Sequence, residues 1–201
     1  MYLCIDVGGT KTLCAVFDEA GKVLEESRMP TPPTYPEFIA QLKVKISELD
    51  HKKYKSCAIA IPGKVDRTKG VGIGFGNLPW KNVPIGKDLQ KFLNIPMAIE
   101  NDANAAALSE ARELPKHYRR VLYVTVSTGI GTGFVIDREL DPDTLDTEGG
   151  HMMLEYENKL QKWQDFASGR AIVKRFGKPA SKIQSIATWK IIAHNIAYGL
   201  I

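Results

Sequence analysis

Two glycine-rich turns constrain this chain most, because each follows an apolar, strand-like run and leads into another. The first spans residues 6–11 (DVGGTK) and the second residues 128–133 (TGIGTG). Glycine lets backbone N–H groups approach an anion without a Cβ in the way, and successive N–H groups form a nest for phosphate oxygens. The acidic segment Glu100 to Asp102 lies between the two turns. Either turn alone is equally compatible with a tight β-hairpin, but the pair predicts a nucleotide-dependent phosphotransferase.

The spacing excludes two better-known phosphate loops. A Walker loop requires Gly-Lys followed by Ser or Thr, and here the four Gly-Lys pairs are followed by Val23, Val65, Asp88 and Pro179. A dinucleotide-binding fingerprint requires G-x-G-x-x-G at the start of a helix. The second turn instead reads G-x-G-x-G, and residues 134–136 continue as a strand.

The composition is ordinary for a soluble globular protein. The 201 residues are 44% hydrophobic and 25% charged, with a net charge of +4. We expect no membrane span and no signal peptide, and we interpret the basic residues 51–55 as a solvated loop without nucleic-acid contact. Three cysteines in strand-like runs, without C-x-x-C spacing, favour free thiols in a cytoplasmic protein. These are Cys4, Cys14 and Cys57.

The hydrophobic pattern predicts alternating strands and helices. Strand-like runs occupy residues 2–5, 12–17, 57–61, 96–99 and 121–126, and helical spacing occurs around residues 39–49, 84–93 and 103–113. After His151 the pattern becomes helical, mainly over residues 163–176 and 186–200. A three-strand opening recurs on both sides of residue 104, which predicts two related α/β lobes, 1–104 and 105–201.

Five motifs give the chain a family resemblance. They are residues 6–11, residues 101–106 (NDANAA), residues 128–131, residues 148–151 (EGGH) and residues 167–172 (ASGRAI). In order and spacing they resemble the ROK family (repressor, open reading frame, kinase), which includes bacterial sugar kinases. The resemblance implies an actin-like, ribonuclease-H-like two-lobed α/β fold, with a sugar between the lobes. It also implies ATP-dependent phosphorylation of a glucose-like hexose at a primary hydroxyl.

The resemblance assigns the donor site to both glycine turns. ATP phosphates are expected on Gly8, Gly9, Thr10 and Lys11, with Thr128, Gly129 and Gly131 as the opposing clamp. Asp6 is expected to hold Mg²⁺ through water, because a carboxylate does not usefully face phosphate directly.

Asp102 is the candidate general base, which would take a proton from the attacking sugar hydroxyl. Local sequence alone favours a simpler role, since either Asn101 or Asp102 could cap the following helix. The two roles are compatible, because one carboxylate oxygen can cap while the other accepts a proton. The sugar-binding positions implied by the resemblance are Gly63, Asn77, Asn101, Asp102, Glu148, His151 and Gln164.

The chain departs from the family pattern at three places. Many ROK proteins carry a cysteine segment that binds zinc after the Gly-His pair, whereas residues 155–163 hold no cysteine, so we expect no zinc site. We expect Tyr156, Leu160 and Trp163 to hold that segment by packing. Gln164 stands where the family has a sugar-binding glutamate. The sequence also ends within an apolar helical pattern, which predicts a C-terminally shortened fold, homo-oligomerisation and weak nucleotide binding.

Three other functions stay open. Polyphosphate could replace ATP as the donor, since some relatives without the cysteine segment use it. A sugar-sensing repressor is disfavoured because Met1 directly precedes the first strand, with no winged helix before it. An inactive, sugar-binding fragment would keep the same motifs.

Overall fold

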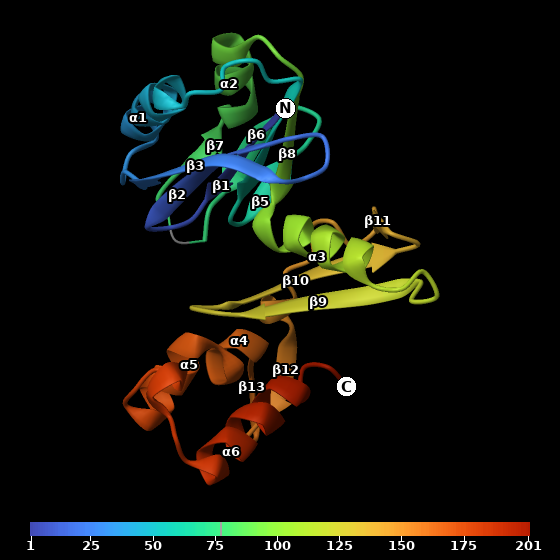
Figure 1. Cartoon of the computed structure of the whole chain (residues 1–201). Helices are drawn as coiled ribbons and strands as arrows, with labels where there is room; N and C mark the ends of the chain where they lie inside the picture. Colours follow the sequence, from blue (N-terminus) through green and yellow to red (C-terminus); the bar gives the residue numbers. More distant parts are fainter. Residues whose placement is uncertain (77) are drawn as a thin grey trace. The chain divides into compact units, whose positions relative to one another are not determined.

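The computed structural model describes residues 1–76 and 78–201. The chain forms two compact units, Met1–Ala105 and Ala106–Ile201 (Figure 1). Helix α3 (Asp102–Glu113) contains the boundary between them.

The first unit is built on a five-stranded sheet with the strand order β3-β2-β1-β4-β8. β1, β2 and β3 are antiparallel neighbours, while β4 and β8 run parallel to β1. The connections to the parallel strands pass through α1 and α2, and a smaller sheet of β5, β6 and β7 precedes α2. The bounds are β1 (Tyr2–Val7), β2 (Lys11–Phe17), β3 (Val23–Pro30), α1 (Tyr35–Glu48), β4 (Ser56–Ile61), β5 (Lys64–Asp66), β6 (Val71–Gly74), β7 (Lys81–Val83), α2 (Ile85–Leu93) and β8 (Met97–Asn101).

Period-two alternation in β1 separates the two faces of this sheet. Leu3, Ile5 and Val7 are buried in the main core, together with Leu42 of α1 and Leu89 of α2. The side chains between them point to the opposite face, which is lined largely by small residues. The helices therefore cover one face and leave the other lightly covered within the first unit.

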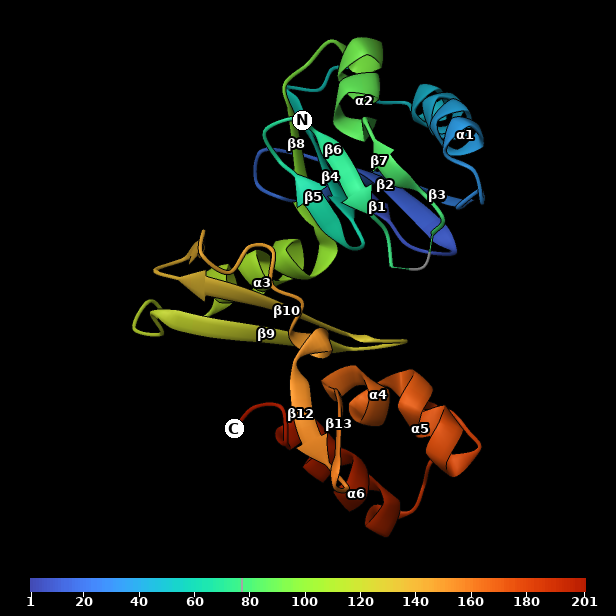
Figure 2. The same ribbon diagram turned by 180° about the vertical axis from the view of Figure 1, so that it is seen from behind.

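The second unit combines a small sheet and a hairpin with most of α3 and with α4, α5 and α6, seen from behind in Figure 2. α3 packs on one face of the β9–β10 ladder through Ala107, Ala111 and Val135. Ile130 and Trp163 form a core on the other face. The bounds are β9 (Arg120–Val126), β10 (Ile130–Ile136), β11 (Glu139–Leu140), the 3-10 turn η1 (Gly149–His151), β12 (Met153–Tyr156), β13 (Lys159–Lys162), α4 (Trp163–Ala167), α5 (Gly169–Phe176), the 3-10 turn η2 (Ala180–Lys182) and α6 (Ile186–Ala197).

The helical pattern predicted directly after His151 is wrong for residues 153–162, which form the hairpin β12–β13. Glu157 and Asn158 have φ angles of 52° and 60°. Two successive positive φ values are the geometry of a type I′ turn, which matches the twist of the flanking strands. The hairpin packs through Tyr156, whose ring stacks on Phe166 with centroids 4.1 Å apart, and not through Leu160, which is 69% exposed.

The predicted helix over residues 163–176 is interrupted at Ser168. This residue is extended (φ −75°, ψ 168°), and its Oγ accepts a hydrogen bond from the N–H of Ala171 at 3.3 Å. A serine in this position satisfies an otherwise unpaired N–H group of a new helix. The break therefore separates α4 from α5.

The apolar face predicted for residues 186–200 is only partly buried. Ile192 is 2% exposed and Ile196 packs against the core, whereas Ile186 is 75% exposed. Helical spacing therefore located α6 correctly, and the expectation that part of this apolar face is exposed is confirmed.

Candidate functional site

The first glycine turn joins β1 to β2 and is closed by its own backbone. The N–H of Gly8 donates to the carbonyl of Lys11 at 2.9 Å, and a Cβ on Gly8 would lie 2.8 Å from that oxygen. Thr31 donates from Oγ1 to the carbonyl of Gly8 at 2.8 Å and fixes the turn from outside. Within the described residues, the N–H groups of Gly9 and Thr10 make no hydrogen bond. Gly8 therefore shapes the turn, while Gly9 and Thr10 offer donors to an anion.

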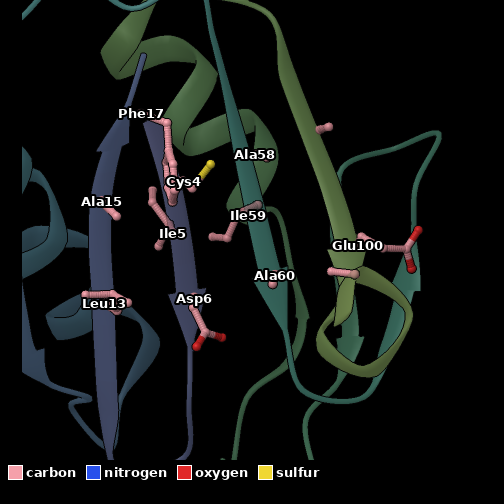
Figure 3. Close-up of a pocket in the computed structure, with 12 residues that line it drawn as sticks. Cys4, Ile5, Asp6, Leu13, Ala15, Phe17, Ala58, Ile59, Ala60 and Glu100 are labelled. Carbon is pink, nitrogen blue, oxygen red and sulfur yellow. The ribbon is translucent and has the colours of Figure 1, made fainter. Parts of the chain in front are cut away.

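Asp6 lies at the carboxyl end of β1, on the face opposite the helices. It is in register with Ala60 of β4, which is in register with Glu100 of β8. These strands are parallel, and ligands of open α/β sheets bind beyond the carboxyl ends of such strands. Figure 3 shows both carboxylates at this end of a cavity of about 300 Å³ with a mainly apolar lining.

The apolar lining affects the charge of Asp6. Partial desolvation raises the pKa of its carboxyl group above the ordinary value of 3.8. A carboxylate in this situation gains from a nearby cation, which favours the charged form. Its chemistry fits a hydrated Mg²⁺, which binds proteins through few carboxylates and retains several waters.

Two residues predicted to bind the sugar, Asn101 and Gly63, are joined by a hydrogen bond. The Nδ2 atom of Asn101 donates to the carbonyl of Gly63 at 3.0 Å, and its Oδ1 accepts from the N–H of Asn104 at 3.0 Å. The second bond identifies Asn101 as the cap of α3. Gly63 has φ +99°, and a Cβ there would overlap the carbonyl oxygen of Gly74, so only glycine fits.

A half-buried ion pair beside this turn was not predicted from the sequence. Arg67 Nε donates to Glu100 Oε2 at 2.7 Å, and Arg67 Nη2 donates to Glu100 Oε1 at 2.5 Å. Glu100 Oε1 also accepts from Asn104 Nδ2 at 3.1 Å and from the N–H of Asn101 at 2.7 Å. Nothing in the local sequence of Arg67 indicates this role, although Asn104 lies within a motif already noted.

Asp102 follows directly as the first residue of α3. Its side chain is exposed, and Oδ1 accepts a hydrogen bond from the N–H of Ala103 at 2.8 Å. A carboxylate is favoured at a helix N-terminus by the exposed N–H groups of the first turn. Because Asn101 caps the helix, Asp102 is not required as the cap.

The second glycine turn is shorter than predicted. The N–H of Ser127 donates to the carbonyl of Gly129 at 2.9 Å, and β10 already begins at Ile130. Gly131 lies within β10 opposite Thr125. Only Thr128 and Gly129 of the predicted clamp therefore belong to the turn, because the ladder with β9 extends farther than the glycine pattern suggests.

Glycines bring the EGGH and ASG motifs against this turn. A Cβ on Gly150 would overlap the carbonyl of Ile130, and one on Gly169 would overlap the carbonyl of Ser127. The N–H of Gly169 donates to that Ser127 carbonyl at 2.7 Å, and the N–H of Gly149 donates to Thr132 Oγ1 at 3.1 Å. These contacts explain why both motifs need glycine.

The remaining predicted sugar ligands lie around the same turn or outside the described residues. Glu148 is half-buried and His151 is exposed, at the start and end of η1. Gln164 Oε1 lies 2.8 Å from the position of a Cβ on Gly129, so this amide reaches the second glycine turn. Asn77 falls outside the described residues.

Across residues 1–76 and 78–201, no group of three or more His, Cys, Asp or Glu side chains is arranged to hold a metal ion. Cys14 and Cys57 are buried, and Cys4 is half-buried. In the same part of the chain, no helix has both the length and the apolar character needed to cross a membrane.

The sheet order of the first unit and the paired glycine turns place the protein in the actin-like, ribonuclease-H-like class of α/β folds. The model for the ROK family matches residues 2–196. The chain belongs to the ROK family.

Three relatives illustrate the likeness. The glucokinase of Streptomyces coelicolor is 32% identical over 181 residues, which cover 85% of this chain and 57% of that enzyme. The second is a Streptomyces griseus ROK family glucokinase, whose crystal structure is in complex with glucose and AMPPNP and whose sequence is 28% identical to this chain. Its TM-score is 0.74, with 86% of this chain and 59% of that chain covered. The inorganic polyphosphate/ATP-glucomannokinase of an Arthrobacter strain is 32% identical, with a TM-score of 0.70 and coverages of 88% and 71%. The chain thus spans less than two thirds of the length of the S. coelicolor glucokinase.

Proposed function

We propose that the protein transfers the terminal phosphoryl group of ATP to a primary hydroxyl of a glucose-like hexose. The observation that carries this proposal is the arrangement at the start of α3. Asn101, held by Gly63, caps the helix through its contact with Asn104, so the carboxylate of Asp102 is presented to solvent at a fixed position.

Asp102 acts as the general base in this reaction. The sugar hydroxyl oxygen attacks the terminal phosphorus, the bond from phosphorus to the leaving-group oxygen breaks, and Asp102 takes the hydroxyl proton. A positioned base of this kind contributes about 10²- to 10⁴-fold to the rate. The hydrogen bond from Ala103 orients the carboxylate through Oδ1.

The donor phosphates are bound by backbone N–H groups and a few side chains. Gly9 and Thr10 donate from the first turn with Lys11 as the nearby cation, and Thr128 and Gly129 provide the second turn. Asp6 would hold Mg²⁺, which supplies charge neutralisation of the phosphates when bound. Phosphoryl transfer depends mostly on such positioning and electrostatic stabilisation.

Sugar hydroxyls are bound by Asn101, Asp102, Glu148 and His151. Gln164 keeps a hydrogen-bonding capacity at the position of the family glutamate but lacks its charge. Inorganic polyphosphate is the alternative donor, supported by the likeness to a kinase whose name includes both donors.

Replacing Asp102 by Asn tests the proposal. The amide oxygen of Asn can still accept the Ala103 hydrogen bond, but the side chain cannot accept a proton. We expect Asp102→Asn to lower the rate of sugar phosphorylation by at least about 100-fold. The thermal midpoint should stay near the parent value, and sugar binding should be retained, because the amide oxygen can still accept a hydrogen bond from the sugar hydroxyl.

Asp143→Asn is the matched control, because it removes the same charge from another exposed aspartate. This control should retain full turnover. An Asp102→Asn rate within about tenfold of the parent would contradict the general-base role.

A further inference from the structure

A polar cavity of about 330 Å³ lies beside the second glycine turn, entirely within the second unit. Its lining includes Thr128 and Gly129 from the turn, Gln164 from α4, and Arg170 and Lys174 from α5. Figures 1 and 2 both show α4 and α5 beside the end of the β9–β10 hairpin where this turn lies. The hydrogen bond from Gly169 to Ser127 fixes that arrangement.

Two cations face this cavity from one side of a helix. Arg170 and Lys174 are four residues apart on α5, so their side chains are neighbours on its surface. Within the described residues, neither side chain forms an ion pair or a hydrogen bond. Arg175, on the same helix, is instead committed to the hydroxyl of Tyr156 at 2.7 Å and to Glu157 at 3.4 Å.

The rest of the lining suits an anion that is bound partly at the glycine turn and partly in this cavity. Gly129 has no side chain, and Thr128 and Gln164 carry hydrogen-bonding groups. Asp165 is the one carboxylate in the lining, against two cations. The volume of the cavity, about 330 Å³, is at the lower end for ligand-binding cavities, which suits a compact chain of phosphates.

We propose that Arg170 and Lys174 bind the phosphate groups of the donor that lie beyond the transferred one. The ligand class is a linear phosphoanhydride chain, supplied either by a nucleoside triphosphate or by inorganic polyphosphate. This inference rests on the proposed function, in which Thr128 and Gly129 bind the donor. The cavity then extends the donor site, and its two cations determine how strongly a longer phosphate chain is held.

Binding of inorganic tripolyphosphate to the full chain, measured by calorimetry at low ionic strength, tests the proposal. Hydrogen bonds to charged groups contribute enough that Arg170→Ala and Lys174→Ala should each weaken binding about tenfold. Lys190→Ala is the matched control, because it removes one exposed positive charge from α6. It should change the dissociation constant by less than about twofold. Thermal melts, with Arg170→Gln as a second variant, check that the fold is kept.

Parallel titrations with ATP identify the source of the phosphate chain. If Arg170→Ala and Lys174→Ala lose as much affinity for ATP as for tripolyphosphate, the cavity binds the phosphates of a nucleoside triphosphate. A loss confined to tripolyphosphate would assign it to polyphosphate. Two results would overturn the proposal. One is an unchanged affinity for tripolyphosphate in both Arg170→Ala and Lys174→Ala, and the other is a loss of affinity in Lys190→Ala as large as the loss in those two variants.

Failure of this inference can be told from failure of the proposed function. Sugar phosphate formed by a protein whose tripolyphosphate binding ignores both substitutions would refute only the inference. Tripolyphosphate binding that depends on Arg170 and Lys174, without any sugar phosphate formed, would refute only the kinase proposal.

Discussion

Individual residues around the start of α3 are fixed by contacts with distant parts of the first unit. Asn101 donates to Gly63, and Glu100 binds Arg67, which lies 33 positions earlier in the chain. The motif at residues 101–106 predicted a functional turn, but it could not predict Arg67, because an ion pair across the fold leaves no local pattern. The residue types in this motif indicated what the turn could do, but the contacts that hold the turn in place could be seen only in the folded structure.

Substitution of Gly63 tests how much this single glycine contributes to the stability of the fold. With φ +99° and the Gly74 carbonyl where a Cβ would lie, Gly63→Ala combines backbone strain with a steric overlap. We expect a loss of about 2–3 kcal/mol in the free energy of unfolding, measured by urea denaturation.

Gly21→Ala separates the two causes. Gly21 has φ +81° but open space where a Cβ would lie, so about 1 kcal/mol should be lost. Equal losses in the two variants would show that the overlap with Gly74 does not matter.

Asp6 gives a prediction in pH. Because desolvation raises its pKa in the folded state above 3.8, the folded protein binds the proton more tightly than the unfolded chain does. The free energy of unfolding therefore falls as the pH rises from 3.8 through the folded-state pKa of Asp6. Asp6→Asn removes this fall, so in the absence of metal its thermal midpoint should exceed that of the parent at pH 7. Thermal melts between about pH 3 and pH 8 measure the effect. A difference between the two proteins that does not depend on pH would contradict the assignment.

At the scale of elements, the sequence predicted long periodic segments better than short ones. Helices α1 and α3 and the parallel strands were located, because their apolar positions repeat over a whole element. The β12–β13 hairpin was missed, since Glu157 and Asn158 are not the Asn-Gly pair that usually marks a type I′ turn. The glycine-rich stretch before Asn77 concealed β6, because glycine weakens a strand pattern.

Asn158 tests the turn that closes this hairpin. Valine is strongly disfavoured at positive φ, so Asn158→Val should lower the free energy of unfolding by about 1–2 kcal/mol in urea denaturation. Asn158→Gly is the matched control and should stay within about 0.5 kcal/mol of the parent, because glycine adopts this conformation readily. A valine variant as stable as the glycine variant would show that the turn has another geometry.

For the whole molecule, the combination of motifs predicted the fold class that the structure and the relatives confirm. The division into two functional lobes, 1–104 and 105–201, stays a prediction. Contacts within the chain divide it into two compact units, Met1–Ala105 and Ala106–Ile201. The choice of sugar and donor could not be predicted, because it depends on a few polar groups such as Gln164 whose partners are ligands.

Transfer of a phosphoryl group from a donor to a hexose is the function proposed for this chain. The most direct measurement is ³¹P NMR of the 201-residue protein with Mg²⁺, a panel of hexoses, and either ATP or polyphosphate. We expect a new sugar phosphomonoester signal with glucose or a close relative and at least one donor, and no such signal with Asp102→Asn. No sugar phosphate with any sugar and donor, from protein that is folded and binds the sugar, would contradict it.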